Sequence, residues 1–470
     1  MLYYDKDTIA AISTAVSPSG IGIVRISGPE ALAAADRIFR SPGGKTILSE
    51  VPSHTIHYGF ITDPEKGDAV LDEVLVSVMR APRSYTAEDT VEINCHGGVL
   101  AVRKVLDTVL KYGARPAEPG EFTKRAFLNG RIDLSEAEAV MDLLESKNEC
   151  ALKNSVSQLR GSLYEVIRSV REEMLLQAAH IEAALDDPEH YNYEDSVPGL
   201  EIMTDAWSQK IRRLIDTAET GRLIREGIKT AIIGRPNAGK SSLLNLLLGE
   251  ERAIVTDIAG TTRDVLTETM NLDGITLIVT DTAGIRDTSD PVERIGVERA
   301  KKSLEQADLV ISVVDASSPL SEEDRDVIHL AAEKKTILLL NKSDLPAVTD
   351  VEMIRRLAEE MHAGEMEIIS FSATEKTGYD ELVSCIKRMF YSGELDFNDE
   401  ILITNVRQKN LLMRAEESLK RLKESLENRM PEDFYSIDLM GAYEALGEIT
   451  GEEVGEDLVN EIFSKFCMGK

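Results

Sequence analysis

The feature that most constrains this 470-residue chain is a glycine-rich loop, Gly234-Arg235-Pro236-Asn237-Ala238-Gly239-Lys240-Ser241. It fits the pattern G-x-x-x-x-G-K-[ST], in which backbone N–H groups and a helix N-terminus bind phosphates. The apolar run 229–233 before the loop predicts a buried strand, and the run 242–248 after it predicts a helix. Strand, loop and helix in this order favour a nucleotide site over a chance glycine turn. We expect Lys240 to contact the β- and γ-phosphates and Ser241 to bind Mg²⁺.

The segment Asn341-Lys342-Ser343-Asp344 indicates which base the bound nucleotide carries. It lies at the end of the apolar run 336–340. The Asp344 carboxylate can accept hydrogen bonds from N1–H and from the 2-amino group of guanine. Adenine offers neither donor and would leave the carboxylate unpaired, at a cost of about 1–3 kcal/mol or more. Ser372-Ala373-Thr374, after the strand-like segment 367–369, is expected to lie behind the same base. The sequence therefore predicts GTP as the nucleotide.

Two further segments complete the GTPase pattern. Asp281-Thr282-Ala283-Gly284 follows the predicted strand 276–280, where Asp281 would hold Mg²⁺ through water and the Gly284 N–H would contact the γ-phosphate. Within Gly260-Thr261-Thr262-Arg263-Asp264, Thr262 is the expected switch threonine that closes on Mg²⁺. The order and spacing of these motifs together predict an α/β P-loop GTP-binding domain of the Ras type.

One position departs from the Ras-type pattern. The residue after Gly284 is Ile285, where Ras-type GTPases carry the glutamine that orients the attacking water. An isoleucine side chain cannot hydrogen-bond water, so hydrolysis needs another orienting group. Acidic candidates lie in the segment 287–294, which can also be interpreted as a solvated switch loop.

Composition restricts the cellular setting. At 470 residues there is room for two to four domains, and the apolar runs are too short for a transmembrane helix. No export or organellar signal is visible at the N-terminus. The four cysteines are scattered, with no C-x-x-C, which argues for a reducing compartment and against structural zinc or a disulfide framework. We expect a cytoplasmic protein with no membrane association.

The formal net charge of −30 bears on nucleic-acid binding. A surface that binds nucleic acid non-specifically usually has a basic face. Any nucleic-acid substrate is therefore expected to be held by a local basic patch or by a partner protein.

Periodicity along the chain predicts four segments. Residues 1–125 alternate short strand-like runs with a helical pattern and predict an α+β domain, and residues 223–392 form the GTPase domain. Residues 126–222 and 393–470 are helical, and each carries an apolar stripe. The stripe residues are Leu163, Ile167, Val170, Met174, Ala178, Ile181 and Leu185 in the first segment, and Leu412, Ala415, Leu419, Leu422 and Leu426 in the second.

Neither helical segment is expected to bury its stripe alone. The economical interpretation is one helical domain formed by two chain segments, with the GTPase domain inserted between them. A coiled coil that forms a dimer is the competing explanation.

With these motifs in place, the chain resembles the MnmE (TrmE) family of GTPases that modify the wobble uridine of certain tRNAs. The resemblance covers nearly the whole length. Its carrying segments are Gly22-Ile23-Val24-Arg25-Ile26-Ser27-Gly28, Cys95-His96-Gly97-Gly98, the run 119–130, the phosphate loop, the run 256–264 and the tail Phe466-Cys467-Met468-Gly469-Lys470.

The resemblance implies that the N-terminal domain binds a tetrahydrofolate derivative (5-formyl- or 5,10-methylene-tetrahydrofolate) and forms a constitutive homodimer. The implied folate contacts are Arg25, Glu92, Arg131 and Lys470. Arg131 stands where relatives can carry lysine, so the charge is kept but the geometry differs. Arg25 on an apolar strand is hard to explain structurally, whereas Glu92 could be an ordinary carboxylate on a strand face.

The resemblance also implies an answer to the missing glutamine. In MnmE-like GTPases a K⁺ ion takes the place of an arginine finger, and its ligands would be Asn237, Thr256, Ile258 and Thr261. The water-orienting group would be Glu293. Motifs and resemblance together give the nucleotide-binding set Asn237, Ala238, Gly239, Lys240, Ser241, Ser242, Thr256, Asp257, Ile258, Ala259, Gly260, Thr261, Thr262, Asp281, Thr282, Ala283, Gly284, Asn341, Lys342, Asp344, Ser372, Ala373 and Thr374.

Cys467 lies four residues from the end of the sequence. The following residues do not suit a prenylation box, and a single cysteine is often a small buried hydrophobe. The resemblance implies instead that Cys467 has a catalytic role in tRNA modification.

The leading hypothesis is a potassium-stimulated GTP hydrolase that works with an FAD-containing MnmG-like partner. Together they would install an aminomethyl or carboxymethylaminomethyl group at C5 of the wobble uridine, with the tRNA bound mainly through the partner. An alternative is a regulatory GTPase for ribosome assembly that performs no modification chemistry. A structural dimer with a vestigial GTPase domain is a third interpretation, which the intact motif set disfavours.

Overall fold

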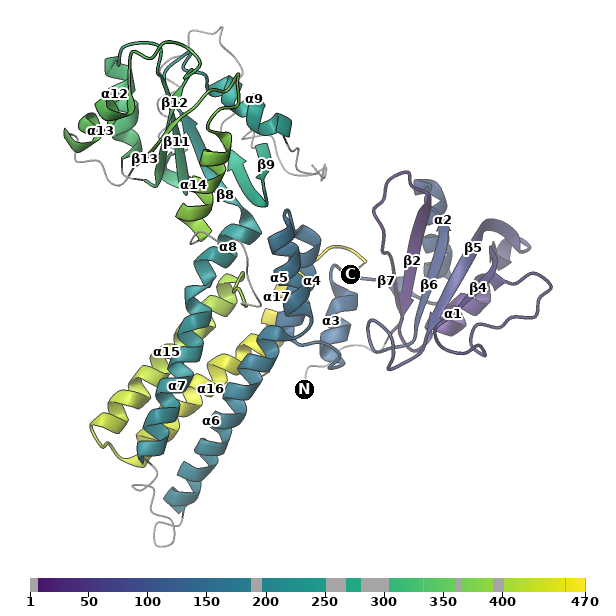
Figure 1. Cartoon of the computed structure of the whole chain (residues 1–470). Coiled ribbons are helices and arrows are strands. Elements are labelled where there is room, and N and C mark those ends of the chain that lie inside the picture. Colours follow the sequence, from purple (N-terminus) through teal and green to yellow (C-terminus); the bar gives the residue numbers. More distant parts are fainter. Residues whose placement is uncertain are drawn as a thin grey trace. The chain divides into compact units, whose positions relative to one another are not determined.

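The computed structural model describes residues 7–186, 197–250, 268–279, 304–332, 334–360, 366–391, 401–452 and 454–469 (Figure 1). The chain is divided into two compact units. The first comprises Met1–Met141, Gln158–Tyr193 and Met430–Lys470, and the second comprises Asp142–Ser157 and Glu194–Arg429.

In its described residues, the first unit contains a seven-stranded sheet with the order β3-β4-β5-β6-β2-β1-β7. Neighbouring strands are antiparallel except β1 and β7, which are parallel. The strands are β1 (Ile9–Ile12), β2 (Ile21–Ser27), β3 (Phe39–Arg40), β4 (Thr55–Asp63), β5 (Ala69–Met79), β6 (Thr90–His96) and β7 (Arg115–Pro116). The alternation of strands and helices predicted for residues 1–125 is confirmed by these strands and by the helices between them.

One face of this sheet is covered by two helices, α1 (Ala31–Ile38) and α2 (Val99–Lys111). Alternation along β2 turns Val24 and Ile26 into this core, where both are fully buried. The side chain of Arg25, which lies between them, therefore points to the opposite face. This explains an arginine in an apolar strand: it belongs to the other surface of the sheet. A short 3₁₀ helix, η1 (Pro64–Lys66), joins β4 to β5.

A buried arginine ties the following helix, α3 (Glu121–Leu128), to the rest of the first unit. Arg125 is 1% exposed, and its guanidinium contacts carboxylate oxygens of Asp7 at 2.7 Å, Glu88 at 3.2 Å and Glu121 at 3.0 Å. Arg115 also contacts Glu121, at 2.6 Å. Burial raises the pKa of Glu121, but the hydrogen bond from Arg115 and its other donors outweigh burial and hold that pKa below its ordinary value.

In the first unit, helices that precede the GTPase segment pack against helices that follow it. The long helix α6 (Ser162–Asp186) lies against α16 (Glu432–Thr450), as Figure 1 shows. The stripe predicted on α6 is buried from Leu163 to Ile181, but the last member of the face is Ala184 rather than Leu185. A smaller core joins α4 (Leu134–Glu145) to α17 (Glu456–Ser464) through Leu134 and Phe463.

The second unit contains a corresponding helix pair. Helix α15 (Val406–Glu427) packs against α7 (Val197–Asp216), and the stripe predicted from Leu412 to Leu426 is buried along it. Its fully buried partners on α7 include Trp207. In both pairs, therefore, a helix before the GTPase segment packs against a helix after it, and this contact buries the predicted stripe. The short helices α5 (Glu149–Leu159) and α8 (Ala218–Glu226) precede the sheet.

The described part of the second unit holds a six-stranded sheet with the order β13-β12-β11-β8-β10-β9. Its strands are parallel except β9, which pairs antiparallel with β10 at one edge. The elements are β8 (Ile228–Ile233), α9 (Lys240–Glu250), β9 (Glu268–Leu272), β10 (Ile275–Val279), β11 (Leu309–Asp315), α12 (Glu322–Ala331), β12 (Thr336–Asn341), α13 (Val351–Glu360), β13 (Met366–Ser370) and α14 (Tyr379–Tyr391).

Helices cover both faces of this sheet. Leu243 of α9 and Leu382 of α14 share one core with alternate residues of the strands, and Ile328 of α12 and Ile354 of α13 share the other. Because both faces are buried, the strands are nearly continuous apolar runs, as the sequence showed. Ligands of such sheets bind at the carboxyl ends of the strands. This edge carries the glycine-rich loop.

Across the described helices, none combines the length and apolar character needed to cross a bilayer. The cysteine side chains are all free thiols, and Cys467 is exposed, whereas Cys95 and Cys385 are buried. Burial raises the pKa of the Cys95 thiol to about 11. Cys467 is therefore not a core residue.

Replacing Arg125 with methionine should destabilise the first unit by about 3–5 kcal/mol, because buried carboxylates lose their counter-charge. Calorimetric melting of the full chain should show the first unit's transition at a lower temperature. The stabilisation from Glu121 should be complete above its unfolded pKa of about 4.3 and lost as pH falls through its lower folded pKa. The control Arg168→Ala removes an exposed ion pair with Glu172 and should leave the transition unchanged. Equal melting of the two variants would contradict the role of Arg125.

Candidate functional site

The glycine-rich loop runs from the end of β8 into the first turn of α9, as predicted. Ala238 is fully buried within it, and the Lys240 ammonium donates to the carbonyl oxygens of Gly234 at 2.6 Å and Arg235 at 2.8 Å. Burial lowers the pKa of Lys240, because the charged form is poorly solvated there. A nearby anion would offset this cost. The loop therefore has the backbone, the helix N-terminus and the half-buried cation that a phosphate group needs.

A single amide joins this loop to the predicted base-recognition segments. The Nδ2 of Asn341 donates to the Ala238 carbonyl at 2.8 Å, and its Oδ1 accepts from the Ala373 N–H at 3.2 Å. Gly239 has φ 106°, and a Cβ atom built on it would lie 1.9 Å from that Nδ2. Glycine is required here both for the backbone conformation and for the approach of Asn341. Asn341 is 3% exposed, and its amide holds the phosphate loop and the loop after β13 together.

The predicted guanine acceptor lies beside the third loop. Ser372 donates its hydroxyl to Asp344 Oδ1 at 2.6 Å, and the Ser343 N–H donates to the Phe371 carbonyl at 3.0 Å. The Thr374 hydroxyl lies 3.1 Å from that of Ser372. Asp344 itself is exposed at the loop surface. Its carboxylate is thus oriented from one side and open on the other, where a base with two adjacent N–H donors could bind.

Other predicted nucleotide residues fall into two groups. Asn237, with φ 63°, precedes Ala238 in the loop, and Ser241 and Ser242 lie in the first turn of α9. The remaining group lies outside the described residues and comprises Thr256, Asp257, Ile258, Ala259, Gly260, Thr261, Thr262, Asp281, Thr282, Ala283, Gly284, Ile285 and Glu293. Their placement stays a prediction.

Two residues that the sequence reasoning passed over also meet at this edge of the sheet. Arg235 lies within the phosphate loop, and Asp315 ends β11. Lys342 Nζ lies 2.6 Å from Asp315 Oδ2, and Arg235 Nη2 lies 3.9 Å from the same oxygen. The available signal was a carboxylate at the carboxyl end of a buried strand, which is where parallel sheets place binding residues.

Predicted folate residues gather at the face of the first unit's sheet that lies opposite α1 and α2, where Phe122 of α3 also packs. Arg25 of β2 and Glu92 of β6 are cross-strand partners, with Arg25 Nε 2.8 Å from Glu92 Oε1. Arg131, in the turn after α3, donates from Nη1 to the Tyr85 carbonyl at 3.0 Å. Lys470, the fourth predicted residue, lies outside the described residues.

An aromatic residue that the sequence did not reveal stands between these arginines. The Tyr85 ring centroid lies 5.1 Å from the guanidinium carbon of Arg25 and 5.1 Å from that of Arg131. Phe122 also contacts Arg25, at 5.5 Å. Tyr85 is itself held by its hydroxyl, 2.8 Å from that of Thr123. No spacing in the sequence links Tyr85 to these residues, because they come from different elements.

The C-terminal tail returns to this same place. The Gly469 carbonyl accepts from the Ser13 hydroxyl at 3.0 Å and from Arg25 Nη1 at 3.5 Å. Gly469 has φ 85°, and a Cβ atom there would lie 2.2 Å from the Ile12 carbonyl oxygen. The Gly120 N–H also donates to the Cys467 carbonyl at 3.3 Å. The tail is thereby fixed beside Arg25, and Cys467 is exposed next to it.

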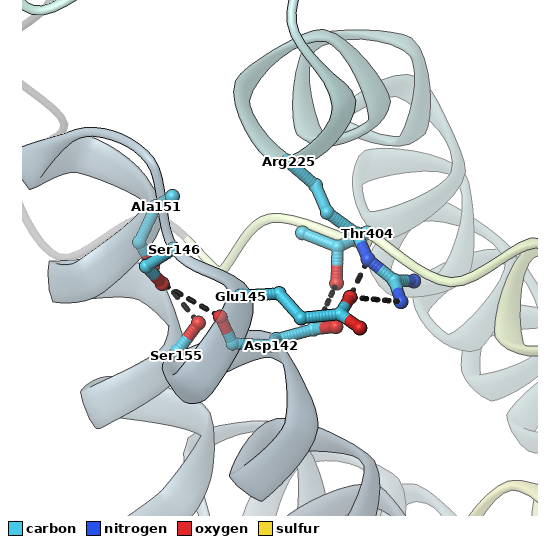
Figure 2. A pocket seen from close by; sticks show the side chains of 7 residues that line it. All are labelled: Asp142, Glu145, Ser146, Ala151, Ser155, Arg225 and Thr404. Atoms are coloured by element: carbon cyan, nitrogen blue, oxygen red, sulfur yellow. Dashed lines mark hydrogen bonds and ion pairs between the residues drawn. The ribbon is translucent and has the colours of Figure 1, made fainter. Parts of the chain in front are cut away.

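A small recess in the second unit is not a ligand site. It is lined by Asp142, Glu145, Ser146, Ala151, Ser155, Arg225 and Thr404 (Figure 2). Both Asp142 carboxylate oxygens are engaged, one by the Thr404 hydroxyl at 2.7 Å and the other by Arg225 Nε at 3.0 Å. These bonds join segments of the unit to one another. Among the described residues, no group of His, Cys, Asp and Glu side chains is arranged to hold a metal ion.

Comparison with known proteins identifies the family. A family model described as GTP-binding protein TrmE N-terminus matches residues 8–131, and one described as MnmE helical domain matches residues 134–467. A protein of Lachnoclostridium phytofermentans is 55% identical over 464 residues, which cover 99% of this chain and 99% of the relative. The chain belongs to the MnmE (TrmE) family.

Other members of the MnmE family align equally fully. A Bacillus cereus relative is 50% identical over 466 residues, covering 99% of both chains. A Lactobacillus delbrueckii relative is 49% identical over 465 residues, covering 99% of this chain and 98% of the relative. All three relatives are named tRNA modification GTPase MnmE. The resemblance predicted from the motifs is therefore confirmed, and the chain is a GTPase of the tRNA-modifying MnmE family.

Asp344→Asn should weaken GDP binding at least about tenfold and allow xanthosine diphosphate to bind instead, because an amide presents a donor where the carboxylate had an acceptor. Competition of the two nucleotides against a fluorescent GDP analogue measures the change. The matched control is Asp326→Asn, the same charge change at an exposed position of α12. Retention of guanine preference in Asp344→Asn would contradict the assignment of the base acceptor.

Proposed function

We propose that this chain is a potassium-stimulated GTP hydrolase that drives modification of the wobble uridine of certain tRNAs. With an FAD-containing MnmG-like partner it installs an aminomethyl or carboxymethylaminomethyl group at C5. The observation that carries the proposal is the Asn341 clamp, which assembles a guanine-nucleotide site within a chain that aligns end to end with tRNA modification GTPases. An acidic chain fits a complex in which the partner supplies the basic surface for tRNA.

The domain arrangement is proposed as four segments with the predicted boundaries. They are residues 1–125, which bind folate and form the homodimer, the two helical segments 126–222 and 393–470, and the inserted GTPase domain 223–392. A helical-domain family model that extends over 134–467 supports an insertion within one helical domain. So do the helix pairs α6–α16 and α7–α15, each of which joins one segment before the GTPase domain to one after it.

In the GTPase site, the loop N–H groups and Lys240 bind the phosphates, and Asp344 selects guanine. The Ser241 hydroxyl, in the first turn of α9, is suited to Mg²⁺, with Thr262 as the second protein ligand. Asn237, an exposed loop residue with φ 63°, is the described member of the proposed K⁺ ligands, with Thr256, Ile258 and Thr261. A bound cation there would offset charge that develops on the β- and γ-phosphates. Glu293 orients the attacking water in place of the absent glutamine.

In the first unit, Arg25, Glu92, Arg131 and Lys470 are proposed to hold a tetrahydrofolate derivative. The residues present suit such a ligand. Arginines at a site edge can bind the ligand's glutamate carboxylates, and a carboxylate can accept from its pterin N–H groups. The Tyr85 ring adds a flat apolar surface between the two arginines. Gly469, two residues after Cys467, accepts hydrogen bonds from Ser13 and Arg25, and Cys467 beside it is proposed to act in the tRNA modification.

A strain that lacks this gene should lose the C5 modification of wobble uridine, measured by mass spectrometry of digested tRNA. Wild-type protein should restore it, and Arg25→Gln should not, while GTP turnover of that variant stays normal. Arg37→Gln, an exposed arginine on α1, is the matched control and should restore modification. Unchanged modification in the deletion strain would contradict the proposal and favour a regulatory role in ribosome assembly.

GTP turnover should be faster in K⁺ than in Na⁺ at equal ionic strength, by about tenfold or more, because a cation of the wrong size stabilises the transition state poorly. Steady-state phosphate release measures the ratio. Glu293→Ala should abolish turnover in both salts and leave GDP affinity nearly intact. Equal rates of the wild-type protein in the two salts would reject the cation role.

A further inference from the structure

The topology of the second unit places one carboxylate between the two halves of the nucleotide site. Strand β11 lies between β8, which leads into the phosphate loop, and β12, which leads into the guanine-recognition segment. All three strands are parallel, so their carboxyl ends meet at one edge of the sheet. Asp315 is the last residue of β11 and is 8% exposed.

The Asp315 carboxylate is held in a fixed orientation. Its Oδ1 accepts from the Ser317 N–H at 2.9 Å and from the Ser317 hydroxyl at 2.6 Å. Its Oδ2 accepts from Lys342 Nζ at 2.6 Å. Burial raises the pKa of Asp315, but the hydrogen bonds from Lys342 and Ser317 outweigh it and hold the pKa below its ordinary value. The group is therefore a carboxylate at neutral pH, directed at the guanine-recognition segment.

Arg235 reaches the same cluster from the phosphate loop. Its Nη2 lies 3.9 Å from Asp315 Oδ2, and it also hydrogen-bonds the Ser318 hydroxyl. Its Nε lies 3.5 Å from Oδ1 of Asp324, a side chain that is 1% exposed.

Asp324 caps α12 with its other oxygen, which accepts from the Ser321 N–H at 3.0 Å. Its Oδ1 is buried and has no hydrogen-bond partner among the described residues. A buried charge without a counter-charge is costly. Arg235 therefore supplies the compensating charge, and the contact fixes its side chain against the sheet.

The anchored Arg235 also bears on the phosphate-binding lysine. The carbonyl oxygen of Arg235 accepts from Lys240 Nζ at 2.8 Å and from the Ala238 N–H at 3.3 Å. Movement of the Arg235 side chain would thus displace the backbone atoms against which Lys240 rests.

We propose that Asp315 is a positioning residue that sets the spacing between the phosphate loop and the guanine-recognition loop, through Arg235 on one side and Lys342 on the other. It touches neither nucleotide nor metal in this role. It acts on affinity, because a ligand that spans both loops binds best when their separation is already correct. The inference rests on the proposed GTP site. It adds the residue that fixes the distance between the phosphate loop and the guanine-recognition loop.

The test uses the full chain with Mg²⁺ and a fluorescent N-methylanthraniloyl GDP analogue, together with steady-state GTP hydrolysis. Asp315→Asn keeps the side-chain volume but turns an amide toward the Lys342 ammonium. The Kd of the analogue and the KM for GTP should both rise about tenfold, while kcat stays within about twofold of the wild-type value. Asp315→Glu, which restores the charge, should recover part of the affinity.

Arg235→Gln tests the same cluster with a second variant. Because the Arg235 side chain is 20% exposed, its replacement should be better tolerated than that of Asp315. It should weaken binding in the same direction. The double variant should lose less than the product of the two single losses, because both act through one cluster. The control Asp326→Asn makes the same charge change at an exposed position of α12 and should leave Kd within about twofold.

Several outcomes would overturn the inference. One is an Asp315→Asn variant that binds the analogue as the wild type does. Another is a fall in kcat at unchanged KM, accompanied by the same loss of melting temperature with and without GDP, which would indicate a purely structural role. If Asp315→Asn does not fold, normal affinity in Arg235→Gln decides against the inference. Failure of the wild-type chain to bind GDP would instead reject the GTP site itself.

Discussion

The nucleotide site depends on one buried side chain that touches two loops at once. Asn341 donates to the Ala238 carbonyl of the phosphate loop and accepts from the Ala373 N–H of the loop after β13. These groups belong to loops that follow different strands of the sheet, and one buried amide side chain gives both a hydrogen-bond partner. The clamp requires Gly239, since any side chain there would occupy the position of the Asn341 amide. The glycine of the motif thus serves the neighbouring loop as well as the phosphate.

Ion pairs make a second connection between the same two loops. Asp315 lies at the end of the strand between the two loops and pairs with Lys342, while Arg235 extends from the phosphate loop toward Asp315 and Asp324. Hydrogen bonds and ion pairs in a partly buried setting are stronger than at a free surface. Arg235 and Lys342, one from each motif, are therefore held by carboxylates that lie outside the motifs.

In the first unit, a hydrogen bond joins a residue near the start of the chain to one near its end. Ser13 and Gly469 are 456 positions apart, yet their hydrogen bond fixes the tail beside Arg25. Alternation along β2 explains why a charged residue interrupts an apolar strand, since Arg25 faces away from the core. The sequence predicted Arg25, Glu92 and Arg131 through the family resemblance, but not Tyr85. Its contacts with Arg25 and Arg131 depend on a loop that folds back over the sheet, and local spacing does not encode such a return.

The sequence by itself determined that a phosphate loop exists, that its base is guanine and that the family is that of MnmE. These properties depend on contiguous residues whose chemistry and local conformation are set by their neighbours along the chain. The strands and the apolar stripes of the helices could also be predicted from the sequence. One stripe residue differed: the packing of α6 on α16 buries Ala184 rather than Leu185. Only the tertiary structure decided that Asp315 lies between Arg235 and Lys342 and that the tail meets β2. Such contacts follow from strand order and helix packing, which bring distant residues together through the burial of shared apolar surface rather than through any local pattern.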